Sequence, residues 1–331
     1  MKKALFLALS LAFLLTACGE TTLPDTSEQN PVDNTQEMSL PESCLLYYDL
    51  GNVSILAEDK SLPLAQNAGD GYQTSYSVWY DGEYQDLALQ DGDSGISVAD
   101  MTGGSAVFDY GAGLVVWNGE RYHCAHLTAQ DSYIPNISPN IPGGILLLEV
   151  SGDCWADGGV SDVACFTGFG TVVICGSGTL RIGGAGIGVG GGNLPYLPGL
   201  ILDGVSFSSG AIFLNERSYS GAPALFVRSG SLETDTLVLS GDLCIAGGSG
   251  TVQYLDGVEN AVFRGGSFEV NQWGDTVIPR LILSGGDATC TDWLPQGTSI
   301  EVGAGTMTAN GIRYWDTVHV YDGGEIVDLM D

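Results

Sequence analysis

The stretch LLLEVSG at residues 146–152 decides the fold, because its pattern returns along the rest of the chain. In it, a short apolar run is followed by a small polar residue and a glycine. The same order returns as VVICGSG at residues 172–178 and as LILDG at residues 200–204. The glycines of the series stand at positions 152, 178, 204, 230, 257, 285 and 311, at intervals of 26, 26, 26, 27, 28 and 26 residues. Such near-constant intervals predict an architecture of stacked repeats.

The apolar runs predict strands, because they are short, rich in Val, Ile, Leu and Phe, and lack the period of a helix. Each glycine is expected to take the positive φ that a tight turn needs. The predicted fold is all-β, a right-handed parallel β-helix or solenoid over residues 146–331, with a cap at its C-terminal end. The residues four positions before the glycines are expected to stack in one interior column: Leu148, Ile174, Leu200, Phe226 and Leu281.

In architecture, residues 146–311 resemble the β-helix of pectate-lyase-like proteins and of Gly-rich clostridial carbohydrate-binding surface proteins. The resemblance implies a glycan ligand, and no catalytic signature comes with it. The catalytic motifs GxSxG, HExxH and the P-loop lysine are absent from the sequence.

Residues 44–145 form a different, aromatic-rich segment in which alternating patterns such as SYSVWY predict strands. This segment is either a separate β domain or the first, irregular part of the solenoid, which would cap its apolar end. The densest set of rings is predicted to bind glycan: Trp79, Tyr80, Tyr84, Trp117 and Tyr122. The alternative is that these rings form the core of the segment.

The N-terminus predicts export and lipid anchoring. Residues 1–17 have the basic start and short apolar stretch of a signal peptide. The sequence LTAC at residues 15–18 resembles the lipobox of bacterial lipoproteins, which implies cleavage before Cys18 and acylation of that cysteine. Residues 18–43 are polar and Pro-containing, which predicts a flexible tether. The expected location is therefore the cell surface, with a membrane contact through the lipid.

Charge restricts the partners. The chain carries 10 Lys and Arg against 40 Asp and Glu, a formal net charge of −30 at pH 7. Removal of the predicted signal peptide, which contains Lys2 and Lys3, leaves 8 basic and 40 acidic residues, a net charge of −32. Such a surface argues against nucleic acid, whose phosphates need basic side chains, and favours cations, neutral partners or basic partners.

No cofactor is expected, although Asp91 and Asp93 could supply oxygen ligands to calcium. A plain turn also explains the sequence DGDSG around them. The GxGxxG at residues 186–191 is followed by NLPYLP, which does not start a helix cleanly, so a glycine-rich turn is predicted there. His123 and His126 lack a second ligand pair with zinc spacing.

The cysteines other than Cys18 suggest little chemistry. Cys175 and Cys244 lie in apolar runs and are expected in the core. Cys154 and Cys165 are close enough in sequence for a local disulfide, which an exported protein permits.

The leading functional hypothesis is a non-catalytic surface lipoprotein that binds a polysaccharide or surface glycan, or mediates adhesion. One alternative is a β-helix polysaccharide lyase or glycoside hydrolase, in which Arg228 and Arg264 could face a groove. The other alternative is a structural envelope protein without a small ligand.

Anchoring can be tested with Cys18→Ser. We expect this variant to leave the membrane fraction, because it removes the predicted acylation site. The measurement is immunoblotting of fractionated cells after a high-salt wash. A variant that still sediments with the membranes would contradict the lipoprotein prediction.

Overall fold

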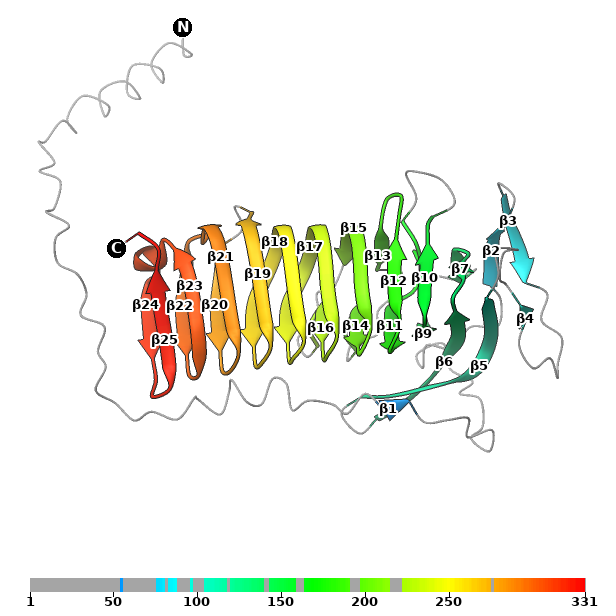
Figure 1. Cartoon of the computed structure of the whole chain (residues 1–331), viewed down its shortest axis with the longest axis horizontal. Coiled ribbons are helices and arrows are strands. Elements are labelled where there is room, and N and C mark those ends of the chain that lie inside the picture. The colour runs from blue at the N-terminus through cyan, green and yellow to red at the C-terminus, as the bar shows by residue number, and fades with distance from the viewer. Residues whose placement is uncertain are drawn as a thin grey trace, which may run out of the picture. The chain divides into compact units, whose positions relative to one another are not determined.

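The described part of the protein is built almost entirely from strands (Figure 1). The computed structural model describes residues 54–55, 76–80, 83–87, 96–97, 104–117, 120–139, 143–158, 164–190, 197–214, 222–274 and 277–330. These residues lie in the compact unit Asp33–Asp331, and the other unit is Met1–Val32. Over the described residues, the helical element is one 3-10 turn, η2 (Ile312–Tyr314), and no helix is long and apolar enough to cross a membrane. The predicted all-β class is confirmed.

One series of strands, called ladder A, pairs in parallel from each strand to the next. Its members are β10 (Asp153–Ala156), β12 (Thr179–Ile182), β15 (Ser206–Leu214), β17 (Ser231–Ile245), β18 (Ser249–Phe263), β19 (Ser267–Trp273), β21 (Asp287–Trp293), β23 (Gly305–Asn310) and β25 (Gly324–Asp328). The short strand β7 (Tyr133–Ile134) pairs in parallel with β10 and extends the series at its N-terminal end.

A second parallel series, called ladder B, alternates with ladder A along the chain. Its members are β6 (Glu120–Gln130), β9 (Ile145–Ser151), β11 (Thr171–Gly176), β14 (Leu200–Asp203), β16 (Leu225–Val227), the C-terminal parts of β17 and β18, β20 (Ile278–Leu283), β22 (Gly297–Val302) and β24 (Thr317–Val320). Strand β13 (Ile187–Val189) pairs in parallel with the end of β15. The result is a long, mostly parallel sheet.

The main core lies between the inward faces of the two ladders. In β10, Cys154 and Ala156 are buried while Trp155 is exposed, as the two-residue period of a strand requires. Across the core, the ring of Phe263 from ladder B lies 5.7 Å from the ring of Phe268 from ladder A. The apolar runs of the sequence therefore supply the buried sides of both ladders.

The interior column differs from the predicted one. Leu148 pairs with Ile174 as expected, but Ile174 pairs with Leu202 and not with Leu200. The column then continues through Val227, Ile245, Phe263, Leu283, Val302 and Val320.

The other predicted members of this column lie elsewhere. Leu200 and Leu281 lie in a neighbouring column, whose residues stand two positions before those of the observed column on each strand. Phe226 points to the opposite side of ladder B, because it is the neighbour of Val227 on a strand.

The fixed period fails because the length of chain between stacked residues changes. Along the observed column, from position 148 through 174, 202, 227, 245, 263, 283 and 302 to 320, the intervals are 26, 28, 25, 18, 18, 20, 19 and 18 residues. Stacking fixes the register of the strands and leaves the length of their connections free. Two later glycines of the series stand outside the turn into ladder A: Gly257 lies within β18 against Leu239, and Gly311 precedes η2.

The turn that leads into ladder A begins with glycines of the predicted series, of which Gly152, Gly204 and Gly230 have the expected positive φ, and it continues with glycines outside that series. Gly248 and Gly266 precede β18 and β19 with φ of 80° each. A Cβ on Gly266 would overlap the backbone of Gly248, and a Cβ on Gly248 would overlap the backbone of Gly230. Glycine is needed here for two reasons, the left-handed backbone and the close approach of successive turns.

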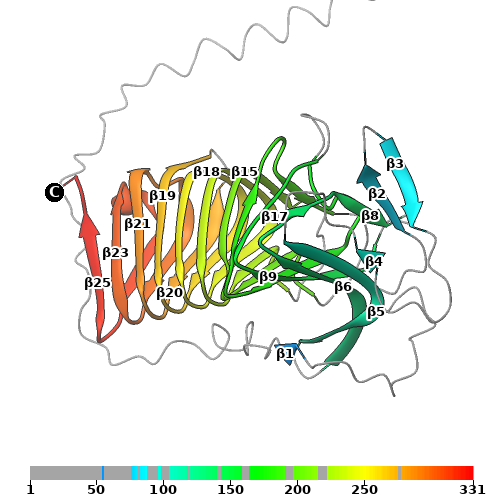
Figure 2. The same ribbon diagram turned by 45° about the vertical axis from the view of Figure 1, so that its right-hand side comes forward.

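Antiparallel strands precede the ladders. β5 (Ser105–Trp117) pairs with β6, and β1 (Ser54–Ile55) and β4 (Ile96–Ser97) each pair with β5. Because β6 also pairs with β9, these strands continue the sheet of ladder B, as Figure 2 shows. A separate three-stranded sheet contains β3 (Glu83–Leu87), β2 (Tyr76–Tyr80) and β8 (Ile137–Pro139).

A second apolar cluster lies on the outer side of ladder B, where Val115 and Trp117 of β5 pack with its side chains. The Trp117 and Phe226 rings meet edge to face with centroids 5.1 Å apart, and both side chains are buried. The N-terminal strands therefore shield part of an apolar sheet face that water would otherwise reach.

Phe226→Ala should lower the free energy of unfolding by about 3–5 kcal/mol, because the buried ring leaves a cavity. The half-buried Phe213 is the matched control, and its alanine variant should cost clearly less. Urea unfolding measures both. A double-mutant cycle with Trp117→Ala should give a coupling of about 0.5–1.5 kcal/mol. A coupling near zero would contradict the packing of these two rings.

Gly266→Ala should destabilise the fold by at least about 1–3 kcal/mol, the usual cost of a left-handed non-glycine residue, with the backbone overlap added to it. The control is Gly210→Ala, because a Cβ at Gly210 meets nothing within 4 Å. That change should leave stability unchanged or raise it by up to about 1 kcal/mol. Equal thermal midpoints for the two variants would refute the role of the glycine turn.

Candidate functional site

Most of the residues expected to bind ligands lie outside the described side chains. Strands β2 and β3 place Trp79 opposite Tyr84 in an antiparallel register, with Tyr80 next along β2. The side chains of these three residues lie outside the described part. Asp91, Asp93 and Cys18 lie outside it as well.

The other two predicted rings are not free surface rings. Trp117 is 3% exposed and packs on Phe226, so neither of its faces is open to a ligand. Tyr122 is partly buried against the same cluster on the outer side of ladder B. Both rings therefore contribute to packing.

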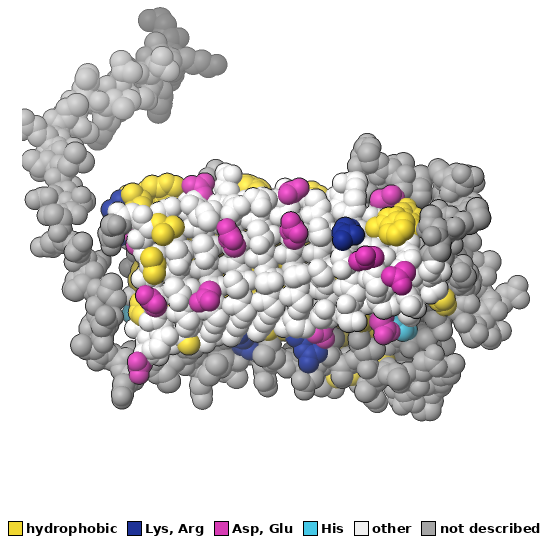
Figure 3. Space-filling model, in the orientation of Figure 1, with side chains coloured by type: hydrophobic (Ala, Val, Ile, Leu, Met, Phe, Trp, Pro, Cys, Tyr) yellow, Lys and Arg dark blue, Asp and Glu magenta, His cyan; other side chains and the backbone are white. Residues whose placement is uncertain are grey.

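The outward face of ladder A carries mostly small polar side chains with scattered carboxylates, and Figure 3 shows this face. An apolar patch interrupts the polar surface near one end, with a basic side chain beside it. The residues of this region come from β7, β10 and β12.

Three side chains form the patch, and we call them the Trp155 row: Tyr133, Trp155 and Arg181. Trp155 pairs with Tyr133 on one side and with Arg181 on the other. In-register neighbours on parallel strands lie about 4.8 Å apart along the ladder. The Trp155 side chain is 43% exposed, which is unusual for so large an apolar group.

Contacts within the row hold the rings in place. The Tyr133 and Trp155 ring centroids lie 6.1 Å apart at an interplanar angle of 58°. The Tyr133 hydroxyl donates a 2.8 Å hydrogen bond to Asp157 Oδ1. The site therefore presents an exposed indole beside a tyrosine whose polar end is already oriented.

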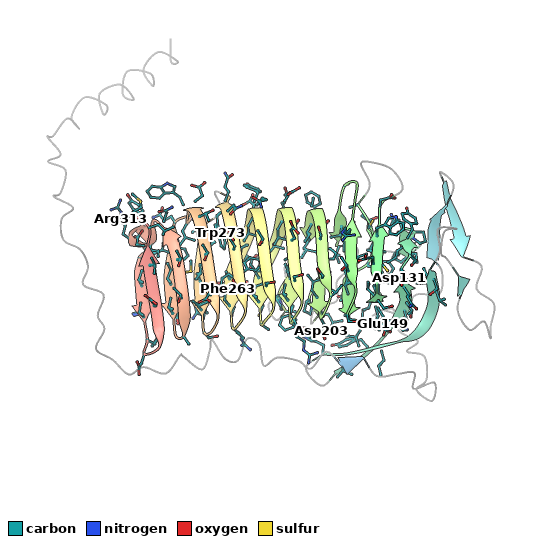
Figure 4. All side chains as sticks on the ribbon, in the orientation of Figure 1. Asp131, Glu149, Asp203, Phe263, Trp273 and Arg313 are labelled. Carbon is teal, nitrogen blue, oxygen red and sulfur yellow. The ribbon has the colours of Figure 1, made fainter. Side chains whose placement is uncertain are left out.

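Asp131 fixes the start of β10, two residues before Trp155. Its Oδ1 accepts a 3.0 Å hydrogen bond from the Asp153 backbone N–H. The Gly152 backbone lies so close to this carboxylate that a Cβ at position 152 would overlap it. Figure 4 labels Asp131 at the end of ladder A where the row lies.

Arg181, in β12 of ladder A, differs from two arginines at ladder B, Arg228 just after β16 and Arg280 in β20. Arg228 forms a 2.8 Å ion pair with Asp203, and Arg280 forms one of the same length with Glu301. Arg181 is exposed, and its guanidinium has no carboxylate partner within the described residues. It can therefore donate hydrogen bonds to a ligand without breaking an ion pair.

The cysteines in the described part of the chain are unsuited to act as nucleophiles. The six described cysteines are buried and free, so Cys154 and Cys165 form no bridge, and Cys175 and Cys244 lie in the core as predicted. Burial raises the pKa of Cys175 to about 12, with the charges of Glu149 and Asp203 adding to the effect. Burial also raises the pKa of Cys124 and Cys165 above the usual range. Protonated buried thiols are weak nucleophiles.

The other motifs also take structural roles. His126 Nε2 lies 3.3 Å from Glu149 Oε2 on the neighbouring strand. The centre of the GxGxxG motif forms β13, where a dinucleotide site would need a turn into a helix. Among the described residues, no group of three or more His, Cys, Asp and Glu could hold a metal ion.

Sequence reasoning missed the Trp155 row because its members are 22 and 26 positions apart and only the register joins them. The sequence DCWA at residues 153–156 does carry a local signal for an exposed ring. On a strand, Trp155 lies on the same side as the polar Asp153, and Cys154 and Ala156 lie on the other side. That pattern predicts an outward-facing tryptophan.

Comparison with known proteins gives no relative. No protein-family model, curated protein or solved structure matches the chain.

Proposed function

We propose that this protein is an extracytoplasmic lipoprotein that binds a neutral glycan at the Trp155 row. The exposure of the Trp155 ring, in register with Tyr133 and Arg181, is the observation that carries this proposal. In the same proposal, the two ladders are the sides of a right-handed parallel β-helix, which holds the row rigidly. Lipid on Cys18 and the tether of residues 18–43 attach the protein to the membrane.

The chemistry of the row fits a sugar. A pyranose ring has an apolar face of C–H groups and a rim of hydroxyls. The exposed Trp155 indole can stack on the apolar face, as aromatic rings do with flat apolar surfaces. The Arg181 guanidinium is in register beside Trp155, and the Asp157 carboxylate binds the Tyr133 hydroxyl two residues along from Trp155, so the row offers both donors and acceptors to the sugar hydroxyls.

The negative charge around the Trp155 row favours a neutral glycan over an anionic one. Asp153 and Asp131 are exposed beside the row, and the chain as a whole has a formal charge of −30. A polyanionic glycan would meet this field with repulsion, and Arg181 alone cannot offset it. A neutral polysaccharide meets no such barrier.

The test is calorimetric titration of the full-length chain, made lipid-free by Cys18→Ser. The probes are trisaccharides derived from glucomannan, mixed-linkage β-glucan and xylan, with trigalacturonate as the anionic comparison. At least one neutral probe should bind, and Trp155→Ala should weaken its binding at the Trp155 row about tenfold to thirtyfold, as truncating an aromatic hot spot does. Trp155→Phe should retain part of the affinity.

Val277→Ala is the matched control, because it removes another exposed apolar side chain at 57% exposure. It should bind like the parent protein, and all variants should share its thermal midpoint. Failure of every neutral probe, or unchanged binding by Trp155→Ala, would refute the proposal. New reducing ends or unsaturated products in the titrated samples would support the lyase or hydrolase alternative instead.

A further inference from the structure

A second aromatic patch lies near the C-terminal end of the ladders. Trp293 ends β21 and is 47% exposed, while Tyr314 in η2 is 53% exposed. Their ring centroids lie 5.8 Å apart at 38°, and the Arg313 guanidinium carbon lies 5.1 Å from the Tyr314 ring centroid. We call these three residues the Trp293 patch. It repeats the composition of the Trp155 row: a tryptophan, a tyrosine and an arginine.

The backbone holds the Trp293 patch together. Gly311 precedes η2 with φ of 85°, and a Cβ there would overlap the Trp293 ring. The glycine therefore lets η2 approach β21 closely. Arg313 Nη2 donates a 3.3 Å hydrogen bond to the Tyr314 hydroxyl, which fixes the guanidinium beside the ring.

The two patches belong to strands near opposite ends of ladder A, whose outward face Figure 3 shows. Figure 3 shows an apolar group with a basic side chain beside it near each end of that face. Figure 4 labels Asp131, two residues before Tyr133, and Arg313 of the Trp293 patch at opposite ends of the ladders. A ligand lying along the face can therefore meet both patches.

The line of ladder A that is in register with Trp155 is polar, and it meets β21 at Thr289, four residues before Trp293. The positions in register with Trp155 and Arg181 are Ser208, Glu233, Thr251, Glu269, Thr289 and Thr308. These side chains can hydrogen-bond to a ligand, and none of them is a bulky ring that would block its path. The two glutamates maintain the charge that disfavours an anionic chain.

The strand pairing sets the span. From β10 to β21 the steps are β10–β12, β12–β15, β15–β17, β17–β18, β18–β19 and β19–β21, which makes six. At about 4.8 Å each, they add up to about 29 Å along the ladder. This length is far beyond a trisaccharide and well within a polysaccharide.

We propose that one extended neutral polysaccharide lies along the outward face of ladder A and binds the Trp155 row and the Trp293 patch at once. This proposal rests on the proposed function and adds a second site and a preference for long chains. Binding at one patch raises the effective concentration of the same chain at the other, so the polymer gains affinity without further contacts.

The experiment compares soluble glucomannan polymer with its trisaccharide, using mixed-linkage β-glucan and xylan in the same two sizes. The parent protein should bind two trisaccharides but one polymer segment, and the polymer should bind about 10² times more tightly or better. Trp293→Ala should bind one trisaccharide with the affinity of the remaining site and should lose the preference for polymer.

A variant between the patches separates bridging from simple binding. Thr251→Arg places a long side chain on β18, four strand steps from β10 and two from β21, so it should keep both trisaccharide sites and lose most of the polymer preference. Val277→Ala should keep both properties. Thermal midpoints equal to that of the parent would show that each variant is folded.

The outcomes distinguish the two proposals. If Trp155→Ala weakens trisaccharide binding but Trp293→Ala keeps the polymer preference, bridging is wrong and the proposed function stands. One trisaccharide per parent protein would likewise overturn the second site and leave the Trp293 patch as a surface for a protein partner. If no trisaccharide binds at all, the proposed function fails first.

Discussion

The structure depends on parallel strands that pair in register from each passage of the chain to the next. The backbone hydrogen bonds fix a spacing of about 4.8 Å, so every turn must also stack at that distance. The turn into ladder A has no room for a Cβ at Gly248 or Gly266, because that atom would overlap the backbone of the preceding turn. With those turns in place, alternate residues of both ladders face inward and form a continuous core. The connections between ladders are not held to this spacing, and their lengths vary.

Covering the outer side of ladder B is the second requirement of this arrangement. Its outward residues are apolar through Phe226 and beyond, which is unusual for a sheet face that meets water. The long strand β5 supplies Trp117 and Val115 to that face. Aromatic residues that a sequence reader would assign to ligand binding are used here for packing. The buried cysteines act there as small apolar side chains.

The outward face of ladder A shows how stacking produces a surface site. Tyr133, Trp155 and Arg181 become neighbours because their strands pair, and no local motif joins them. The same rule gives an ordered row of hydroxyl and carboxylate groups along the ladder. A rigid sheet can therefore present groups of this kind at a regular spacing, which suits a ligand that is itself a regular polymer.

The sequence by itself determined the fold class, because short apolar runs broken by glycine leave strands and tight turns as the stable local structures. It also placed Cys175 and Cys244 in the core, since they stand within such runs. It did not determine the register. Leu200 and Leu202 are equally apolar, and which of them stacks on Ile174 depends on the length of the intervening connection.

Only the tertiary structure decided which aromatic rings are free. A ring in a strand points to one side or the other according to its position, but whether that side is covered depends on residues far away in the chain. Trp117 and Trp155 both lie in strands; one is 3% exposed and the other is 43% exposed. The difference arises because Trp117 faces ladder B across a packed interface, whereas Trp155 stands on the open side of ladder A.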